Sequence, residues 1–422
     1  MSDTIFALAS ARGKAGVSVI RLSGEQAFDI AAKLCGDVPK DRGLRFLRAD
    51  GVVLDQALVL TFVQGASFTG EQVVEFQCHG SPAVIASVCE ALSVAGGRLA
   101  DPGEFTRRAL ENERLDLSQV EGLSDLIEAE TEAQRKQAFA LMDGGLTQKV
   151  ERWRTDLIRA AALIEATIDF ADEDVPVDVS PEVSALIIGV SEDLSQEIRG
   201  SFVAERVRDG FEVAIIGPPN IGKSTLLNAL AGRQAAITSE IAGTTRDVIE
   251  VRMDLEGIPV TVLDTAGLRE TDDTIEALGI DLARKRAEAA DIRVFLTVDE
   301  NTGGFGVFPQ DTDLILKGKA DEGGGVSGKT GAGLDQMIGH ITQILSTRIA
   351  LTQSAVRLRH RTAMEDAMGY ITAAVALMDD EDDGALVAME LNTALHAMNS
   401  IIGRVGVEDL LDEIFASFCL GK

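Results

Sequence analysis

The sequence predicts a mixed α/β and α protein in which a P-loop nucleotide-binding domain is inserted into a helical domain that follows a small N-terminal α/β domain. Three observations lead to this fold class. Short β-like runs separated by turn residues fill residues 1–117. Helical periodicity fills 118–208 and returns over 346–422, while apolar strands alternate with helical segments over 209–345. The two helical stretches are expected to pack together, with the parallel sheet of the α/β domain looped out between them.

Composition limits the classes of function. The 422 residues suit two to four domains, and the net charge of −29 argues against a protein that grips nucleic acid alone, because such proteins present a basic surface. No apolar run reaches the roughly 18 residues of a membrane span, and no secretory signal is evident. The cysteines show no metal-ligand spacing, which predicts reduced thiols in a cytoplasmic protein. Three of them are expected to be buried, namely Cys35, Cys78 and Cys89.

The first two regions contain local signals for strands, turns and helix ends. Residues 17–22 and 58–62 are predicted strands, with turns at 68–70 and 79–82. Ser118 with Glu121 predicts a capping box at the start of the first helix, and Asp143-Gly144-Gly145 predicts a break before the next. The expected core stripes of these helices are Val120, Leu123 and Ile127, then Val150, Trp153, Leu157 and Ile164.

The central region carries a phosphate-binding pattern. Residues 217–224 read GPPNIGKS between the apolar run 213–216 and a helical segment. This strand–loop–helix context predicts a P-loop whose backbone N–H groups surround phosphate oxygens. Lys223 is expected to reach the β- and γ-phosphates, and the Ser224 hydroxyl to ligate Mg²⁺. The nucleotide contacts expected from this loop are Asn220, Ile221, Gly222, Lys223, Ser224 and Thr225.

Two further segments predict a Ras-like GTPase domain. The strand 260–263 ends in DTAG, where Asp264 would lie in the second shell of Mg²⁺ and the Gly267 N–H would sense the γ-phosphate. Between the two motifs lies GTTRD, in which Thr245 is favoured to complete the Mg²⁺ ligands. Leu268 occupies the position where many GTPases carry a glutamine that orients the attacking water, so another group must do this. The contacts expected here are Thr244, Thr245, Asp264, Thr265, Ala266 and Gly267.

The base-recognition motif departs from the usual pattern. Residues 318–321 read GKAD, which resembles the NKxD guanine motif with its asparagine replaced by glycine. Asp321 can accept two hydrogen bonds from guanine, and the stem of Lys319 can cover the ring. The lost side-chain amide predicts weaker binding that Gly318→Asn would restore, with guanine still favoured over adenine. The loop expected to back the base comprises Ser327, Gly328 and Lys329.

Segments outside the nucleotide motifs carry a family resemblance. Residues 16–24 read GVSVIRLSG, 68–71 read FTGE, 102–109 read PGEFTRRA and 418–422 read FCLGK. With the P-loop they resemble the MnmE (TrmE) family of tRNA-modification GTPases over nearly the whole chain. The resemblance implies a homodimer joined through N-terminal folate-binding domains and an FAD-containing partner, MnmG (GidA). Together the two proteins would modify carbon 5 of the wobble uridine of certain tRNAs, using a tetrahydrofolate one-carbon unit.

The same resemblance implies roles for individual residues. Glu276 would orient the attacking water, and a K⁺ ion would stand in for an arginine finger when two GTPase domains meet. Cys419 would lie near the folate pocket and take part in tRNA modification. The implied folate contacts are Arg21, Glu75, Lys422 and Arg114, the last in place of a family lysine. The implied K⁺ ligands are Asn220, Ser239, Ile241 and Thr244.

Two other functions fit part of the pattern. A ribosome-assembly GTPase of the Era or EngA type would share the P-loop and Leu268, but it should carry a basic RNA-binding domain, which the sequence does not show. A nucleotide-gated scaffold would need little turnover. Hydrolysis is favoured over the scaffold by the intact residues Lys223, Ser224, Asp264 and Glu276.

Overall fold

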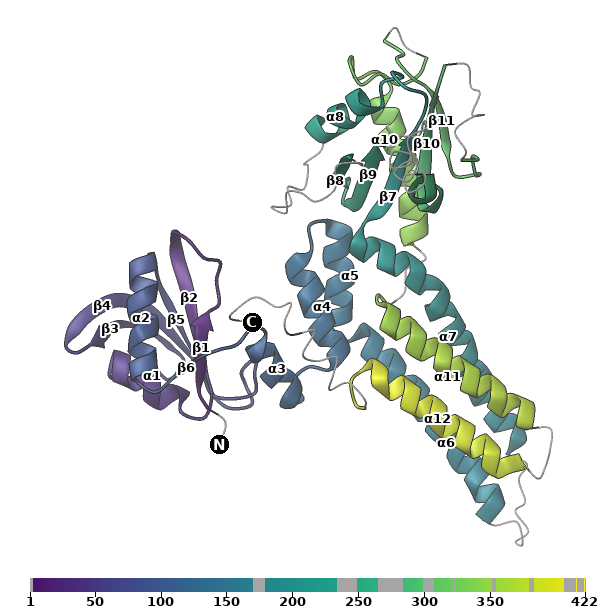
Figure 1. Ribbon diagram of the computed structural model, residues 1–422. Helices are drawn as coiled ribbons and strands as arrows, with labels where there is room; N and C mark the ends of the chain where they lie inside the picture. Colours follow the sequence, from purple (N-terminus) through teal and green to yellow (C-terminus); the bar gives the residue numbers. More distant parts are fainter. Residues whose placement is uncertain are drawn as a thin grey trace, which may run out of the picture. The chain divides into compact units, whose positions relative to one another are not determined.

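The computed structural model of the chain describes residues 3–169, 179–233, 249–264, 284–298, 307–321, 324–350, 354–378, 383–405, 415 and 421. Figure 1 shows their helices and strands. The chain divides into two compact units. The first unit comprises residues up to 124 together with those from 399 onward, and the second comprises 125–398. The mixed α/β and α fold class is confirmed, while the predicted domain boundaries at 117, 208 and 345 stay predictions.

The first unit is built on a six-stranded sheet with strand order β3-β4-β5-β2-β1-β6, antiparallel except where β1 pairs with β6. The predicted strands 17–22 and 58–62 lie within β2 and β4. The turn predicted at 79–82 is wrong at its start, because Gly80 still belongs to β5; a Cβ there would lie 2.4 Å from the Ala15 carbonyl oxygen. The strands are β1 (Ile5–Leu8), β2 (Ala15–Ser23), β3 (Arg42–Ala49), β4 (Val52–Phe62), β5 (Val73–Gly80) and β6 (Arg98–Leu99).

Helices α1 (Ala27–Cys35) and α2 (Pro82–Val94) contribute to the apolar core on this sheet. Cys35 and Cys78 are buried there as predicted, whereas Cys89 is only half-buried. Burial raises the pKa of all three thiols, that of Cys78 to about 12. These cysteines are therefore neutral thiols at physiological pH.

The chain from residue 399 onward returns to the first unit. The Leu117 N–H donates to the Ile402 carbonyl at 3.3 Å, and a Cβ at Gly403 would lie 2.7 Å from the Cβ of Leu117. Phe415 is buried against Val120. The unit is thus closed by residues that lie almost 300 positions later in the chain.

A buried arginine joins separate segments of the first unit. The Arg108 side chain, on α3 (Glu104–Glu111), is 8% exposed and donates to Asp3 Oδ1 at 2.8 Å, Glu104 Oε1 at 3.0 Å and Glu71 Oε1 at 3.2 Å. The hydrogen bond from Arg98 lowers the pKa of Asp3. For Glu104, burial is outweighed by hydrogen bonds from Arg98, the Asp101 N–H and Arg108, so its pKa is lowered as well. Sequence reasoning did not find this cluster.

Replacing Arg108 with methionine is expected to destabilise the first unit by about 3–5 kcal/mol, because the largely buried carboxylate of Glu71 would lose the cation that it pairs with, while Asp3 and Glu104 would keep only Arg98. The pKa values of Asp3 and Glu104 are both depressed in the folded state. The carboxylates therefore stabilise the fold above their ordinary pKa near 4, and that stability is lost as the pH falls through the folded-state pKa. Urea unfolding at several pH values measures both effects. Arg42→Met, at an exposed arginine of β3, is the matched control. If the Arg108 and Arg42 variants had equal free energies of unfolding, Arg108 would not stabilise the first unit.

The first long helix begins at a different capping box from the predicted one. α4 (Leu117–Glu128) has Asp116 as its N-cap: Asp116 Oδ1 accepts from the Gln119 N–H at 2.9 Å, and Gln119 Oε1 accepts from the Asp116 N–H at 3.0 Å. Ser118 instead donates to Asp116. The predicted Ser118–Glu121 box is therefore wrong, since Leu117 is already helical.

A second capping box, which was not predicted, separates α4 from α5 (Glu132–Met142). It is formed by Thr131 and Gln134. The predicted break at Gly144 lies between α5 and α6 (Gly145–Asp169), as expected.

Helices α6, α7 (Ser180–Asp209), α11 (Leu358–Leu377) and α12 (Gly384–Ile401) run alongside one another (Figure 1). α7 packs against both α6 and α11, so helices that lie before and after residues 209–345 in the sequence are packed together. Most of the predicted stripe is core, with Val120, Val150, Trp153 and Leu157 all fully buried. Ile127 is 40% exposed, so its assignment to the core is wrong.

The second unit contains a five-stranded sheet of order β11-β10-β7-β9-β8. Strands β11, β10, β7 and β9 pair in parallel, as predicted. The edge strand β8 is antiparallel to β9, because Glu256 (φ 52°) and Gly257 (φ 89°) form a tight hairpin turn between them. The Ala133 N–H of α5 donates to the carbonyl oxygen of Gly257 at 2.9 Å, which ties this turn to the helical region. The elements are β7 (Phe211–Ile216), α8 (Lys223–Arg233), β8 (Ile249–Leu255), β9 (Ile258–Asp264), β10 (Ile292–Thr297), β11 (Leu314–Lys317) and α10 (Leu334–Ile349).

None of the helices in the described part of the chain combines the length and apolar character that crossing a lipid bilayer requires.

Candidate functional site

Motifs far apart in the sequence meet at one edge of the five-stranded sheet. β7 leads into the P-loop, β9 ends at Asp264, and β11 leads into Gly318. The register pairs Ile215 with Asp264 and Thr297 with Lys317, so the carboxyl ends of these parallel strands are level. Ligands of open α/β sheets bind outside these ends. The fold therefore places the predicted phosphate, Mg²⁺ and base motifs around one site.

The P-loop backbone needs small or left-handed residues at three points. A Cβ at Gly217 would lie 2.6 Å from the Leu296 carbonyl oxygen, which leaves no space for a side chain. Asn220 has φ 60° and Gly222 has φ 107°, conformations that asparagine and glycine tolerate best. The loop then enters α8, whose N-terminal N–H groups favour an anion.

Lys223 points back into the P-loop. Its side chain is buried, and its Nζ donates to the carbonyl oxygens of Gly217 at 2.8 Å and Pro218 at 3.1 Å. The cation is therefore held inside the loop that surrounds phosphate oxygens in P-loop proteins.

A hydroxyl and a carboxylate stand beside this lysine. Ser224 Oγ donates to Asp264 Oδ2 at 2.8 Å. Asp264 is 2% exposed, and its Oδ1 has no hydrogen-bond partner within the described residues. An unpaired buried carboxylate oxygen is costly unless a ligand or cation satisfies it. The pair therefore fits Mg²⁺, which prefers such oxygen ligands.

The predicted base loop is held in place by Ser327. Its buried hydroxyl donates to Asp321 Oδ1 at 2.5 Å and accepts from the N–H groups of Lys329 and Thr330, both at 3.2 Å. A Cβ at Gly328 would lie 2.6 Å from the Thr225 carbonyl oxygen, so this loop packs closely against the start of α8. The structure thus brings Asp321 and the loop 327–329 up to the P-loop helix.

The surroundings of Gly318 bear on one expectation. A Cβ at this position would lie 2.7 Å from Ile221 Cγ1 and 3.1 Å from the Ile221 carbonyl oxygen. Asparagine cannot enter without moving a buried side chain of the P-loop. The structure therefore gives a reason to expect that Gly318→Asn alone does not restore base binding, because Ile221 would have to move.

Several predicted residues lie outside the described part of the chain and stay predictions. They are Ser239, Ile241, Thr244, Thr245, Thr265, Ala266, Gly267, Leu268, Glu276, Cys419 and Lys422.

The first unit brings two of the implied folate residues together. Arg21 on β2 faces Glu75 on β5, and Arg21 Nε donates to Glu75 Oε1 at 2.8 Å. The two side chains are only 22% and 17% exposed, so the pair is largely shielded from solvent. The Arg21 guanidinium also lies 5.9 Å from the ring centre of Phe68 and 5.7 Å from that of Phe105. Sequence reasoning missed these aromatic contacts, although both phenylalanines lie in the quoted motifs.

The other implied folate positions are only partly described. The Arg114 Cγ lies 3.3 Å from where a Cβ of Gly70 would stand, beside the loop that carries Phe68. A Cβ at Gly421 would lie 2.2 Å from the Leu8 carbonyl oxygen, so the chain next to Lys422 packs against the end of β1.

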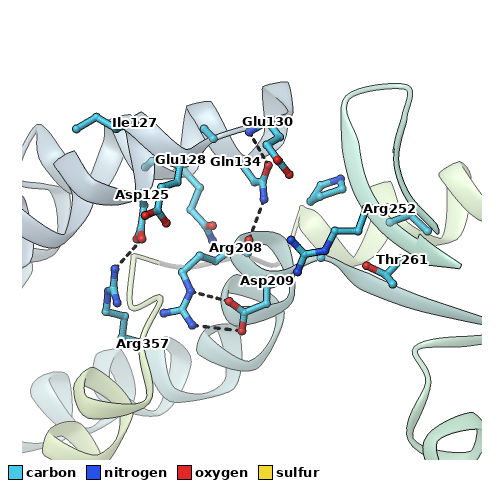
Figure 2. Close-up of a pocket in the computed structure, with 16 residues that line it drawn as sticks. Asp125, Ile127, Glu128, Glu130, Gln134, Arg208, Asp209, Arg252, Thr261 and Arg357 are labelled. Atoms are coloured by element: carbon cyan, nitrogen blue, oxygen red, sulfur yellow. Dashed lines mark hydrogen bonds and ion pairs between the residues drawn. The ribbon is translucent and has the colours of Figure 1, made fainter. Parts of the chain in front are cut away.

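A cavity of about 800 Å³ lies elsewhere in the second unit (Figure 2). Its lining comes from α4 and α5, the end of α7 and the β8–β9 hairpin, and it contains the ion pairs of Arg357 with Asp125 at 2.6 Å and Arg208 with Asp209 at 2.8 Å. Asp209 precedes the amino end of β7, whereas the P-loop follows its carboxyl end. This cavity is therefore separate from the nucleotide site.

Comparison with known proteins decides the family. The family profile described as "MnmE helical domain" matches residues 117–419, and that described as "GTP-binding protein TrmE N-terminus" matches residues 4–114. The chain belongs to the MnmE family. Proteins named "tRNA modification GTPase MnmE" from Cereibacter sphaeroides and Ruegeria pomeroyi are 59% and 58% identical to it, with 100% of each chain covered. The family predicted from the quoted motifs is thereby confirmed.

Proposed function

We propose that this chain hydrolyses GTP and acts in tRNA modification. With an FAD-containing partner of the MnmG (GidA) type, it would modify carbon 5 of the wobble uridine of certain tRNAs, giving 5-carboxymethylaminomethyl or aminomethyl groups. One observation carries the proposal: in a chain of the MnmE family, a single sheet edge brings together Lys223, the Ser224–Asp264 pair and Asp321. The net charge of −29 supports a tRNA held jointly with the partner rather than by this chain alone.

The residues of the phosphate site divide the work of hydrolysis. Lys223 and the N–H groups of the P-loop offset the charge that develops on the phosphate oxygens. Ser224 would ligate Mg²⁺, and Asp264 would orient a water of that ion. Glu276 would place the attacking water, because Leu268 cannot. A K⁺ ion held by Asn220, Ser239, Ile241 and Thr244 would complete the site when two GTPase domains meet.

The proposed folate site lies in the first unit. Arg21 and Glu75 form a half-buried pair, and Arg114 stands near the loop that carries Phe68. Packing of Gly421 against β1 supports a role for the adjacent Lys422. We propose that these residues hold a tetrahydrofolate derivative in its 5-formyl or methylene form, in a cytoplasmic homodimer joined through the N-terminal domains.

Replacing Cys419 with serine tests the modification step. The exchange is nearly isosteric, so folding and GTP turnover should stay close to wild type. Wobble-uridine modification, measured by nucleoside analysis of tRNA from cells that depend on the variant, should fall strongly, because serine lacks the acidity of a thiol that a neighbouring lysine activates.

Cys89→Ser is the matched control, since burial keeps the Cys89 thiol neutral. Normal modification in the Cys419 variant would make this cysteine structural. An equal loss of GTP hydrolysis would mean that the two sites are more tightly coupled than proposed. Unmodified wobble uridine should also accumulate in cells that lack the chain altogether; its absence would overturn the proposed function.

A further inference from the structure

We infer that this chain selects its nucleotide through the N1 and 2-amino edge of guanine, and that Ile221 occupies the space that a side chain at position 318 would need to reach N7. The inference rests on the proposed GTPase function and adds a specificity-determining pair, Ile221 and Gly318. It follows from the packing of that pair and from the support of Asp321.

The space at position 318 is filled from the P-loop side. Gly318 is buried, and its Cβ position is 2.7 Å from Ile221 Cγ1 and 3.1 Å from Cδ1. Ile221 is 5% exposed and belongs to the apolar core of the second unit, so it cannot swing away freely. The Gly318 N–H donates to the Thr297 carbonyl at 3.0 Å, which also fixes the backbone.

The two edges of guanine present different hydrogen-bonding groups to the protein. The N7 atom is an acceptor and needs a donor, such as a side-chain amide. Gly318 offers no side chain, and the Ile221 side chain beside it has no donor. The opposite edge offers two N–H donors, and Asp321 is the matching acceptor.

The Asp321 carboxylate is held in place by a hydrogen bond from Ser327. It accepts from the buried Ser327 hydroxyl, which two backbone N–H groups hold in turn. Such support fixes the direction of the carboxylate before the base arrives. Selectivity therefore rests on the N1 and 2-amino edge of the base and is indifferent to position 7.

A panel of three nucleotides tests this on the full chain. Calorimetry gives the Kd of GDP, of 7-deaza-GDP, which lacks the N7 acceptor, and of IDP, which lacks the 2-amino group. We expect GDP and 7-deaza-GDP to agree within about twofold, and IDP to bind about 10- to 100-fold more weakly, since a hydrogen bond to a charged carboxylate is lost. A 7-deaza-GDP affinity more than fivefold below that of GDP overturns the inference but leaves the GTPase proposal intact. A chain that binds no GDP overturns the GTPase proposal itself.

Two variants test the space-filling pair. Gly318→Asn alone should weaken all three nucleotides, because its Cβ collides with Ile221. Gly318→Asn combined with Ile221→Ala opens the space, and GDP should then bind about 2- to 10-fold more tightly than 7-deaza-GDP, the effect of one net hydrogen bond. Ile221→Ala alone should show no such preference. If the double variant does not fold, the nucleotide panel on the unchanged chain still decides; if it folds and shows no N7 preference, Ile221 does not occupy that space.

Discussion

GTP hydrolysis by the Lys223→Ala variant should be at least about 100-fold slower than that of the unchanged chain, the usual cost of removing one donor from a developing anion. The expectation follows from where the amine lies. Its Nζ is within hydrogen-bond distance of two P-loop carbonyls, in the concave side of the loop that receives phosphate. Phosphate release at saturating GTP and Mg²⁺ measures the effect, and GDP affinity should fall as well.

Lys317→Ala is a matched control, because this lysine is exposed on β11. The control should hydrolyse GTP normally. If the Lys223 variant kept more than a tenth of the activity, the P-loop would not be the hydrolytic site.

Replacement of K⁺ by Na⁺ at constant ionic strength should slow GTP turnover at least about tenfold, since the proposed K⁺ ion takes the part of an arginine finger. The structure improves the choice of variant. Asn220 has φ 60°, so alanine would add backbone strain to the loss of the side-chain ligand. Asn220→Gly tolerates this conformation and removes only the amide.

Asn220→Gly should therefore lose the difference between the two salts while it still binds GDP. Initial rates of hydrolysis in each salt provide the measurement, and equal rates for the unchanged chain would exclude a K⁺ requirement. A variant that keeps its response to K⁺ would remove Asn220 from the set of ligands.

The sequence predicted the parts of the site that depend on local pattern. A P-loop is a continuous segment whose glycines and lysine serve one backbone conformation, so residues 217–224 identify it without any tertiary information. Residues 264 and 321 follow predicted strands, and parallel strands must bring their carboxyl ends together.

Features that depend on contacts between distant residues were not predictable. Gly318 lies almost 100 positions from Ile221, and nothing in either segment shows that their side-chain volumes compete. Arg108 reads as one charge in a helix, yet it gathers carboxylates from three segments. The predicted Ser118 capping box is wrong for a smaller reason: Asp116 is an equally good N-cap, and the helix begins two residues earlier than predicted, at Leu117.

The division of the first unit between two distant stretches of chain affects how the protein is made. Domains generally fold as units during synthesis, in order from the N-terminus. Here residues 3–124 emerge first, but Ile402 and Phe415, which pack against Leu117 and Val120, leave the ribosome only after the whole second unit. The nucleotide domain can therefore fold before the unit that precedes it in the chain is closed. A chain that ends between the first unit and residue 402 lacks the residues that cover Leu117 and Val120, so we expect this fragment to expose apolar surface and to be degraded faster than the full chain.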